Sequence, residues 1–215
     1  MKKFWLKTFV GHIMSYLNLL LVYRYWSRIY RFIWERQYRY VPVTTYKSLQ
    51  ELVLVIQTCK WSADGWKQLW DAFSYPGKVQ YIINTQPPEK RFIGDCDEHA
   101  LYIATALERT VNGENFSISP YAEWRNSVIE SAQVLTVNWI NKDGVYGGHN
   151  VCLITFYDRL GVTAYSYMDY GQPSIAKDTV RKVVQQVMDR YARDGIVLAW
   201  AIHDKDLHLK EVHLS

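Results

Sequence analysis

The sequence predicts an α+β protein in which helices come first and an antiparallel sheet follows. Up to about residue 108, apolar residues recur at helical spacing between proline and glycine breaks. After Asn112-Gly113 they form short β-branched and aromatic segments separated by turn sequences such as Asn141-Lys142-Asp143-Gly144. With 215 residues and 49% hydrophobic content, the chain can bury a sizeable core. Helices followed by strands are typical of α+β architecture.

Each element follows from its local pattern. We expect helices over residues 48–58, 64–73, 96–108 and 175–191, and strands over residues 116–122, 132–140, 150–157, 162–168 and 196–202. Tyr75-Pro76-Gly77 is expected to be a turn, as is the segment 158–161. Val41-Pro42-Val43 separates a first segment, residues 1–40, from the main domain, residues 41–215, since proline ends a helix at or before the residue preceding it.

The segment 1–40 is a basic and aromatic helical arm. It holds eight Lys or Arg and one acid, Glu35, so it carries +7, which leaves −3 on the remainder of a chain whose net charge is +4. Its longest stretch without charge, residues 8–23, is shorter than the roughly 20 apolar residues that span a bilayer. We therefore expect a cytoplasmic protein that can also lie at the periphery of a membrane.

Two interpretations of the arm remain open. Arg24, Arg28, Arg31 and Glu35 recur at spacings of four, three and four, so one helical face is charged and aromatic or aliphatic residues cover the rest. Such a helix suits an anionic membrane surface. It equally suits packing by its aromatic residues against the domain. Nucleic-acid binding is disfavoured, because no recognised motif accompanies the charge.

The number and spacing of the cysteines favour a reducing compartment, and Cys96 alone is a candidate for a chemical role. Cys59, Cys96 and Cys152 are too few for a disulfide framework, and no CxxC pair suggests a zinc site. Cys59 and Cys152 fit core positions. The acids and histidine around Cys96 are consecutive and would point in different directions on a helix, so we expect neither a metal nor another cofactor. A metal site built from Cys96, His149 and Asp169 is the less favoured alternative.

Cys96 is the candidate nucleophile. Asp95 is a good N-cap and Glu98 lies three residues later, which makes Cys96 the first residue of a helix. A sulfur at this position is near the positive end of the helix dipole, where a thiolate is favoured. Asp95, Asp97 and Glu98 add negative charge and oppose ionisation, so an imidazolium partner is needed.

His149 is the preferred base and Asp169 its orienting acid. A hairpin turn around residues 158–161 would place these two residues opposite each other, near the same end of two paired strands. Gly148, just before His149, would let a substrate chain approach closely. The rival base is His99, three residues after Cys96, although a role in capping or in the substrate pocket suits it better. His203, His208 and His213 are expected at the surface of the C-terminal tail.

These residues carry a resemblance to a known family. The segment Gly94-Asp95-Cys96-Asp97-Glu98-His99-Ala100 resembles the Gly-Asp-Cys helix start of bacterial transglutaminase-like cysteine proteinases, within the transglutaminase-like cysteine peptidase superfamily, which is distantly papain-like. The resemblance covers residues 60–172 and includes the chain order Cys96, His149, Asp169. It implies a papain-like core in which the helix that carries the cysteine packs on an antiparallel sheet.

The resemblance also implies acyl transfer through a thioester on Cys96. Hydrolysis of a peptide or isopeptide bond in a protein or peptide substrate is the preferred outcome. Transfer to an acceptor amine, which cross-links proteins, is an alternative. The other alternative is a catalytically silent binding or assembly module with the same fold.

Overall fold

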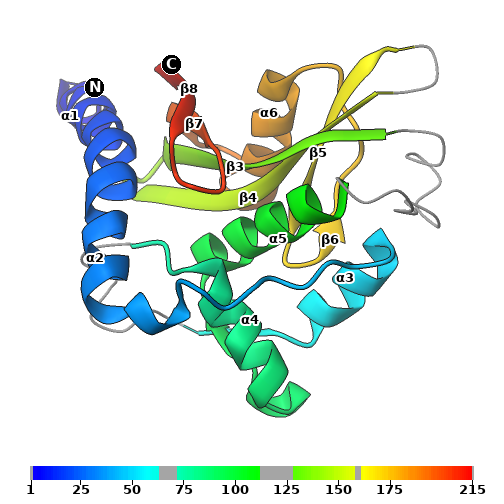
Figure 1. The fold of residues 1–215 in the computed structure, drawn as a ribbon. Coiled ribbons are helices and arrows are strands. Elements are labelled where there is room, and N and C mark those ends of the chain that lie inside the picture. The colour runs from blue at the N-terminus through cyan, green and yellow to red at the C-terminus, as the bar shows by residue number, and fades with distance from the viewer. Residues whose placement is uncertain (1, 63–71, 112–127, 158–160, 215) are drawn as a thin grey trace.

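The computed structural model describes residues 2–62, 72–111, 128–157 and 161–214 (Figure 1). Within them, helices and a six-stranded sheet form an α+β protein, which confirms the predicted class. The expected strand at residues 116–122 and most of the expected helix at residues 64–73 lie outside the described residues, as does most of the turn at 158–161.

The sheet is antiparallel throughout, in the order β6-β5-β4-β3-β7-β8. Its strands are β3 (Val128–Ile140), β4 (Tyr146–Tyr157), β5 (Thr163–Asp169), β6 (Gln172–Pro173), β7 (Ile196–His203) and β8 (Leu209–Leu214). Four of them match predicted strands, with bounds shifted by a few residues. The two edge strands, β6 and β8, were not predicted.

One helix covers each face of this sheet (Figure 1). The helix α5 (Cys96–Val111) packs on one face, and α6 (Val180–Tyr191) packs on the other. Along β4 the side chains alternate between the two faces. Cys152 and Ile154 belong to the core on the α5 side, whereas Val151 and Leu153 belong to the core on the α6 side. The middle of β4 is therefore buried on both sides.

Two shorter helices complete the α5 side. The helix α3 (Leu49–Gln57) begins where predicted, because the Ser48 side chain accepts a hydrogen bond from the Glu51 N–H at 3.2 Å. The predicted turn at Tyr75–Gly77 was wrong, because Pro76 begins the helix α4 (Pro76–Thr85). Proline suits both a turn and the first position of a helix, since its fixed φ fits either.

Short elements lie between these helices. The two-stranded parallel sheet pairs β1 (Lys60–Trp61) with β2 (Phe92–Gly94), and the short helix η4 (Pro88–Lys90) precedes β2. Cys59 follows α3 and is half-buried, whereas Cys152 lies fully in the core.

The N-terminal arm forms one helical column at the edge of the molecule (Figure 1). Its parts are α1 (Lys2–Leu17), η1 (Asn18–Trp26), α2 (Ser27–Trp34) and η2 (Arg36–Tyr38). In α1, Gly11 lies against Tyr146 and Leu198, where an added Cβ would come within 2.5 Å of the Tyr146 ring. None of the described helices is long and apolar enough to cross a membrane.

Polar residues dock α2 onto the domain. Arg31 is buried and donates to the carbonyl oxygens of Phe73 at 2.8 Å and Ser74 at 3.0 Å. Glu35 is also buried and accepts from Lys78 Nζ at 2.7 Å. The apolar residues Ile29, Phe32 and Ile33 are exposed. In α2, buried polar residues therefore make these contacts with the domain, and Phe32 faces away from it.

The histidines of the C-terminal segment differ from the prediction in one case. His203 ends β7 fully buried, and burial lowers its pKa to about 4 despite the opposite effect of Asp204. His208 is exposed, and His213 stacks on Trp200 with ring centroids 4.0 Å apart. The prediction of a surface position was wrong for His203 because this part of the tail continues a central strand.

Candidate active site

Cys96 is the first residue of α5, as the capping pattern predicts. Asp95 Oδ1 accepts from the Asp97 N–H at 3.0 Å, and Glu98 Oε2 accepts from the Asp95 N–H at 3.2 Å. This reciprocal arrangement is a capping box, and it fixes the helix start. Gly94 precedes it with φ of 112°, and an added Cβ there would lie 2.5 Å from Glu98 Oε2. Glycine is therefore required beside the capping box.

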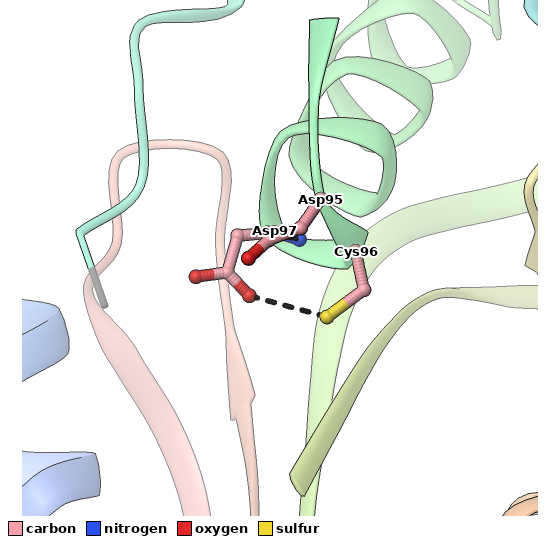
Figure 2. A group of neighbouring side chains, drawn as sticks. All are labelled: Asp95, Cys96 and Asp97. Atoms are coloured by element: carbon pink, nitrogen blue, oxygen red, sulfur yellow. Dashed lines mark hydrogen bonds between the residues drawn. The ribbon is translucent and has the colours of Figure 1, made fainter. Parts of the chain in front are cut away.

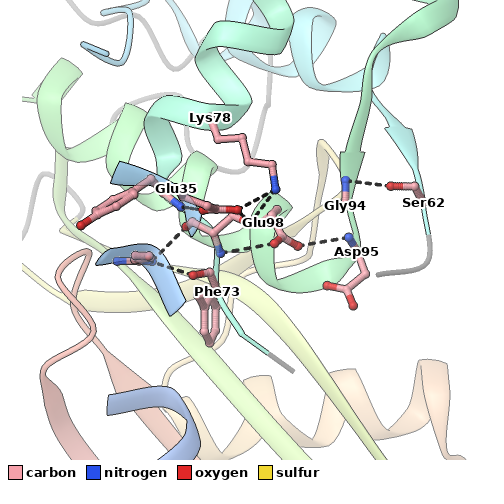
Figure 3. A network of polar contacts seen from close by, with 10 residues as sticks. Glu35, Ser62, Phe73, Lys78, Gly94, Asp95 and Glu98 are labelled. Atoms are coloured by element: carbon pink, nitrogen blue, oxygen red, sulfur yellow. Dashed lines mark hydrogen bonds and ion pairs between the residues drawn. The ribbon is translucent and has the colours of Figure 1, made fainter. Parts of the chain in front are cut away.

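Glu98 also connects the start of α5 to the N-terminal arm (Figure 3). Its Oε1 accepts from the Ser74 N–H at 3.3 Å, and the Ser74 hydroxyl donates to Glu35 Oε1 at 2.8 Å. Lys78 Nζ binds the same Glu35 oxygen at 2.7 Å. Burial pushes the pKa of Glu35 upward, but Lys78 and the surrounding donors hold it below its ordinary value. The residue is therefore a charged partner in this network.

The half-buried thiol of Cys96 lies beside Asp97 and Asn150 (Figure 2). Its Sγ is 3.5 Å from Asp97 Oδ1 and 4.0 Å from Asn150 Nδ2. Asn150 Nδ2 also donates to Asp97 Oδ1, and Thr136 Oγ1 donates to Asn150 Oδ1. The amide therefore directs its donor group at both the sulfur and the carboxylate.

His149 and Asp169 form the buried pair that the sequence predicts. His149 Nε2 lies 3.0 Å from Asp169 Oδ1. Tyr191 donates its hydroxyl to Asp169 Oδ2, and Arg190 Nη1 lies 3.5 Å from the same oxygen. Burial raises the pKa of Asp169, but the bonds from His149 and Tyr191 and the Arg190 charge bring it below the ordinary value. The carboxylate is therefore charged and held in place on both oxygens.

The strand register places this pair on one face of the sheet. In β4 and β5, Cys152 pairs with Met168. This register is offset by two residues from the one in which His149 and Asp169 would pair directly. An even offset keeps both side chains on the same face. His149 pairs with Val137 of β3 and contacts Tyr191 of α6, with ring centroids 4.0 Å apart. The pair therefore lies on the α6 side.

Cys96 reaches β4 from the other face. Asn150, the residue after His149, points toward α5 and contacts the sulfur. His149 contacts Asp169, whereas the sulfur of Cys96 contacts Asp97 and Asn150. The structure thus brings His149 to Asp169, and brings the next residue of β4 to Cys96, at the same end of the sheet.

Tyr170 lies between the two sides. Its ring centroid is 4.6 Å from that of His99 on α5 and 5.9 Å from that of His149. Its φ of 47° is rare for a residue with a side chain and costs about 1 kcal/mol or more. Burial raises its pKa, and the neighbouring Cys96 and Asp169 raise it further. The hydroxyl is therefore neutral and can donate a hydrogen bond.

The two residues expected to contact substrate occupy different environments. His99 is 3% exposed, and neither ring nitrogen has a hydrogen-bond partner in the described part of the chain. Burial lowers its pKa to about 4, and Asp169 acts weakly in the opposite direction. Gly148 is exposed, and an added Cβ would come 2.7 Å from Asn138 Oδ1. The missing side chain of Gly148 thus makes room for a neighbouring strand.

No family model, curated protein or solved structure matches the chain. The resemblance to transglutaminase-like cysteine peptidases therefore depends on the residues themselves, chiefly on the helix start at Cys96 and on the order of Cys96, His149 and Asp169.

Asp95, Cys96 and Asp97 form a group of potential metal ligands at this site (Figure 2). One atom from each of Asp95, Cys96 and Asp97 lies within 4.8 Å of the others. Asp95 Oδ1 already accepts a helix N–H, and Asp97 Oδ1 already accepts from Asn150. These two carboxylate oxygens therefore accept hydrogen bonds at the start of the helix and from the Asn150 amide.

Sequence reasoning missed three residues of this region. Asn150 follows His149, but only the packing of α5 on β4 shows that it reaches the sulfur. Tyr191 and Arg190 lie at the end of α6 and reach Asp169 from about twenty residues away. The local sequence carries no signal for such contacts.

Proposed function

We propose that the chain is a cysteine-dependent amide hydrolase, a peptidase or amidase of the transglutaminase-like type. Cys96 is its nucleophile, and the His149–Asp169 pair supplies its general base and acid. The observation that carries the proposal is the buried 3.0 Å contact between His149 and Asp169, at the end of the sheet where β4 meets the start of α5. A carboxylate that orients a histidine in this way is the arrangement of a catalytic triad.

The contact between His149 and Asp169 bears on which ring nitrogen of His149 carries a hydrogen. If Nε2 carries the hydrogen that Asp169 accepts, Nδ1 is the nitrogen that can take a proton. Tyr191 and Arg190 hold the other carboxylate oxygen and keep Asp169 charged. A charged, fixed carboxylate stabilises the imidazolium that forms when the thiol loses its proton.

The reaction then follows ordinary acyl-transfer chemistry. The Cys96 thiolate attacks an amide carbonyl carbon, and the carbonyl oxygen becomes an oxyanion. The backbone N–H of Cys96 and Asn150 Nδ2, which lies 4.0 Å from the sulfur, are suitable donors to that oxygen. The C–N bond breaks as His149 protonates the departing amine. Water then attacks the thioester, which releases the acid and restores the thiol.

Proton transfer between Cys96 and His149 requires their side chains to move toward each other. His149 and Cys96 lie on opposite faces of β4, with Tyr170 between His149 and the α5 side. Under the proposal, the His149 ring reaches the thiol around the end of the sheet, past Tyr170. The dependence of Cys96 reactivity on His149 is therefore the decisive measurement.

The test is the rate of alkylation by iodoacetamide between pH 5.5 and 9. Burial raises the pKa of Cys59 to about 11 and also raises that of Cys152, so both react slowly in this range. We expect Cys96→Ala to remove the fast reaction. His149→Gln should slow it about tenfold near pH 6.5, because the thiolate loses its imidazolium partner. The exposed His208→Gln is the matched control and should change nothing.

Two results would contradict the proposal. Equal fast labelling of the Cys96→Ala variant would show that another thiol reacts. An unchanged pH profile in His149→Gln would show that the His149–Asp169 pair does not act on Cys96. That second result would favour a binding or assembly module, for which the contacts of Cys96 with Asp97 and Asn150 are the supporting observation.

A separate assay distinguishes hydrolysis from cross-linking. Casein is incubated with the protein and a fluorescent primary amine, and both the released peptides and the amine incorporated into casein are measured. Hydrolysis predicts new peptides without incorporation. Incorporation that depends on Cys96 would instead assign protein-glutamine acyl transfer.

A further inference from the structure

We infer that the outward face of the N-terminal column lies on an anionic lipid bilayer surface. This inference is independent of the proposed chemistry. The outer stripe, as we define it, consists of Leu6, Ile13, Leu17, Leu21, Ile29 and Ile33, which are 41–57% exposed. Leu6, Ile13 and Leu17 are spaced by seven and four residues within α1, and Ile29 and Ile33 by four residues within α2, so each set lies on one side of its helix. The stripe runs along α1, η1 and α2.

The docked side of the column fixes which side faces outward. Ser27, Arg31 and Glu35 recur at spacings of four and are all buried against the domain. Ser27 Oγ accepts from the Phe73 N–H at 3.2 Å, and Arg31 donates to two carbonyl oxygens of the same segment. In α1, Gly11 lies close to Tyr146 and Leu198. The apolar stripe is therefore held away from the protein core, and water is its alternative environment.

The accessible charge of the column is positive. Residues 1–40 contain eight Lys or Arg and one acid, and that acid, Glu35, is buried and bound to Lys78. Lys7, Arg28, Arg36 and Arg39 are exposed. Cations that flank an apolar helical face can bind lipid headgroups while the apolar side chains enter the interface. Each cation near an anionic surface strengthens binding roughly fivefold.

Aromatic residues near the end of the column fit the same surface. Trp34 is 54% exposed, and Tyr40 is 80% exposed. Tryptophan and tyrosine are enriched where hydrocarbon meets water, because their rings are apolar and their N–H or O–H groups are polar. Arg39 lies over the Tyr40 ring, 5.5 Å from its centroid, which adds a cation at the same place.

A second copy of the chain suits this face less well. Pairing two columns would bring a segment of charge +7 against another of the same charge, with no exposed acid in residues 1–40 to compensate. Like charges across an interface are destabilising. An anionic bilayer satisfies both the apolar stripe and the cations.

The test is co-sedimentation of the full chain with vesicles. We expect binding to vesicles of phosphatidylcholine with 30% phosphatidylserine and much weaker binding to phosphatidylcholine alone. Ile29→Gln with Ile33→Gln should weaken binding about tenfold, because both side chains leave the interface. The matched control is Leu54→Gln with Ile175→Gln, two exposed apolar residues outside the arm, and it should bind like the wild type.

A second pair of variants tests the charge. Arg36→Gln with Arg39→Gln should weaken binding to anionic vesicles more than tenfold, whereas Lys90→Gln with Arg193→Gln should leave it unchanged. Failure of the wild type to bind, or equal binding by the arm variants and their controls, would overturn the inference. So would a concentration-dependent dimer in sedimentation velocity without lipid that the Ile29 and Ile33 changes dissociate, since the occupant would then be a second copy.

Discussion

The buried ring of His99 gives a quantitative prediction about stability and pH. His99 lies in the first turn of α5, is 3% exposed and makes an edge contact with Tyr170. Its ring nitrogens have no hydrogen-bond partner in the described part of the chain, so no hydrogen bond in that part stabilises a charge on the ring. Burial lowers its pKa from 6.5 to about 4, although Asp169 acts in the opposite direction.

The sign of the effect follows from linkage. Between pH 6.5 and pH 4, the unfolded chain binds a proton at His99 that the folded protein does not. The free energy of unfolding therefore falls as the pH decreases through this range. A pKa difference between 6.5 and about 4 corresponds to about 3 kcal/mol when both states are protonated. At pH 5 about 2 kcal/mol of this is lost.

The change to test is His99→Phe, which keeps an aromatic ring against Tyr170 and removes the titrating group. Urea unfolding is measured at pH 7.5 and pH 5.0 for both proteins. We expect the wild type to lose about 2 kcal/mol more than the variant over this interval. Other titrating groups, including the buried His203, affect both proteins equally and cancel.

The exposed His208→Phe is the matched control and should retain the wild-type loss. Equal losses in the wild type and His99→Phe would refute the reasoning, because His99 would then be charged or partnered in the folded protein. The outcome also bears on the chemistry. A histidine that stays neutral down to about pH 4 cannot supply an imidazolium to Cys96 near neutral pH, which is consistent with the proposed assignment of that role to His149.

Three further changes test the interactions that hold the site. Glu35→Gln should lower the free energy of unfolding in urea by about 3 kcal/mol, because it leaves Lys78 without its buried partner; an effect below 1 kcal/mol would contradict this. Gly77→Ala should cost more than about 2 kcal/mol by the same measurement, since the new Cβ would lie 2.3 Å from the Tyr38 carbonyl oxygen, and near-neutrality would show that α4 shifts freely. Tyr191→Phe should cost about 1 kcal/mol at pH 7, and this loss should shrink as the pH falls through the lowered pKa of Asp169, because the bond from Tyr191 stabilises the fold most while that carboxylate is charged; a loss that does not change with acidification would indicate packing instead.

Local patterns predicted most of the sheet and the helix of Cys96. Helical spacing and the capping pair of Asp95 and Glu98 depend on neighbours in the sequence, so they can be recognised without the fold. The edge strand β8 was missed because Lys210 and Glu211 are adjacent, so its short sequence lacks the regular alternation of apolar and polar residues that predicts a strand. The start of α4 was missed because Pro76 fits a turn and a helix start equally well.

The face of β4 on which His149 lies could not be predicted. A strand buried on one side reveals its orientation by alternation, but β4 is apolar on both sides, with Val151 and Leu153 on one and Cys152 and Ile154 on the other. The sequence therefore does not predict whether the side chain of His149 or that of Asn150 faces α5. The predicted contact between His149 and Asp169 is present although the strand register differs by two residues from the expected one. An even offset keeps both side chains on the same face of the sheet.

The N-terminal arm and the start of α5 share one polar network, and this connects the two proposals (Figure 3). Glu35 binds Ser74, Ser74 donates its N–H to Glu98, and Glu98 accepts from Asp95 at the cap of the helix that begins with Cys96. The inner side of the column thus helps to fix the candidate nucleophile, while its outer side presents the apolar stripe. Removing the arm would disturb both, which is why single exposed residues of the stripe, rather than truncation, separate membrane attachment from chemistry.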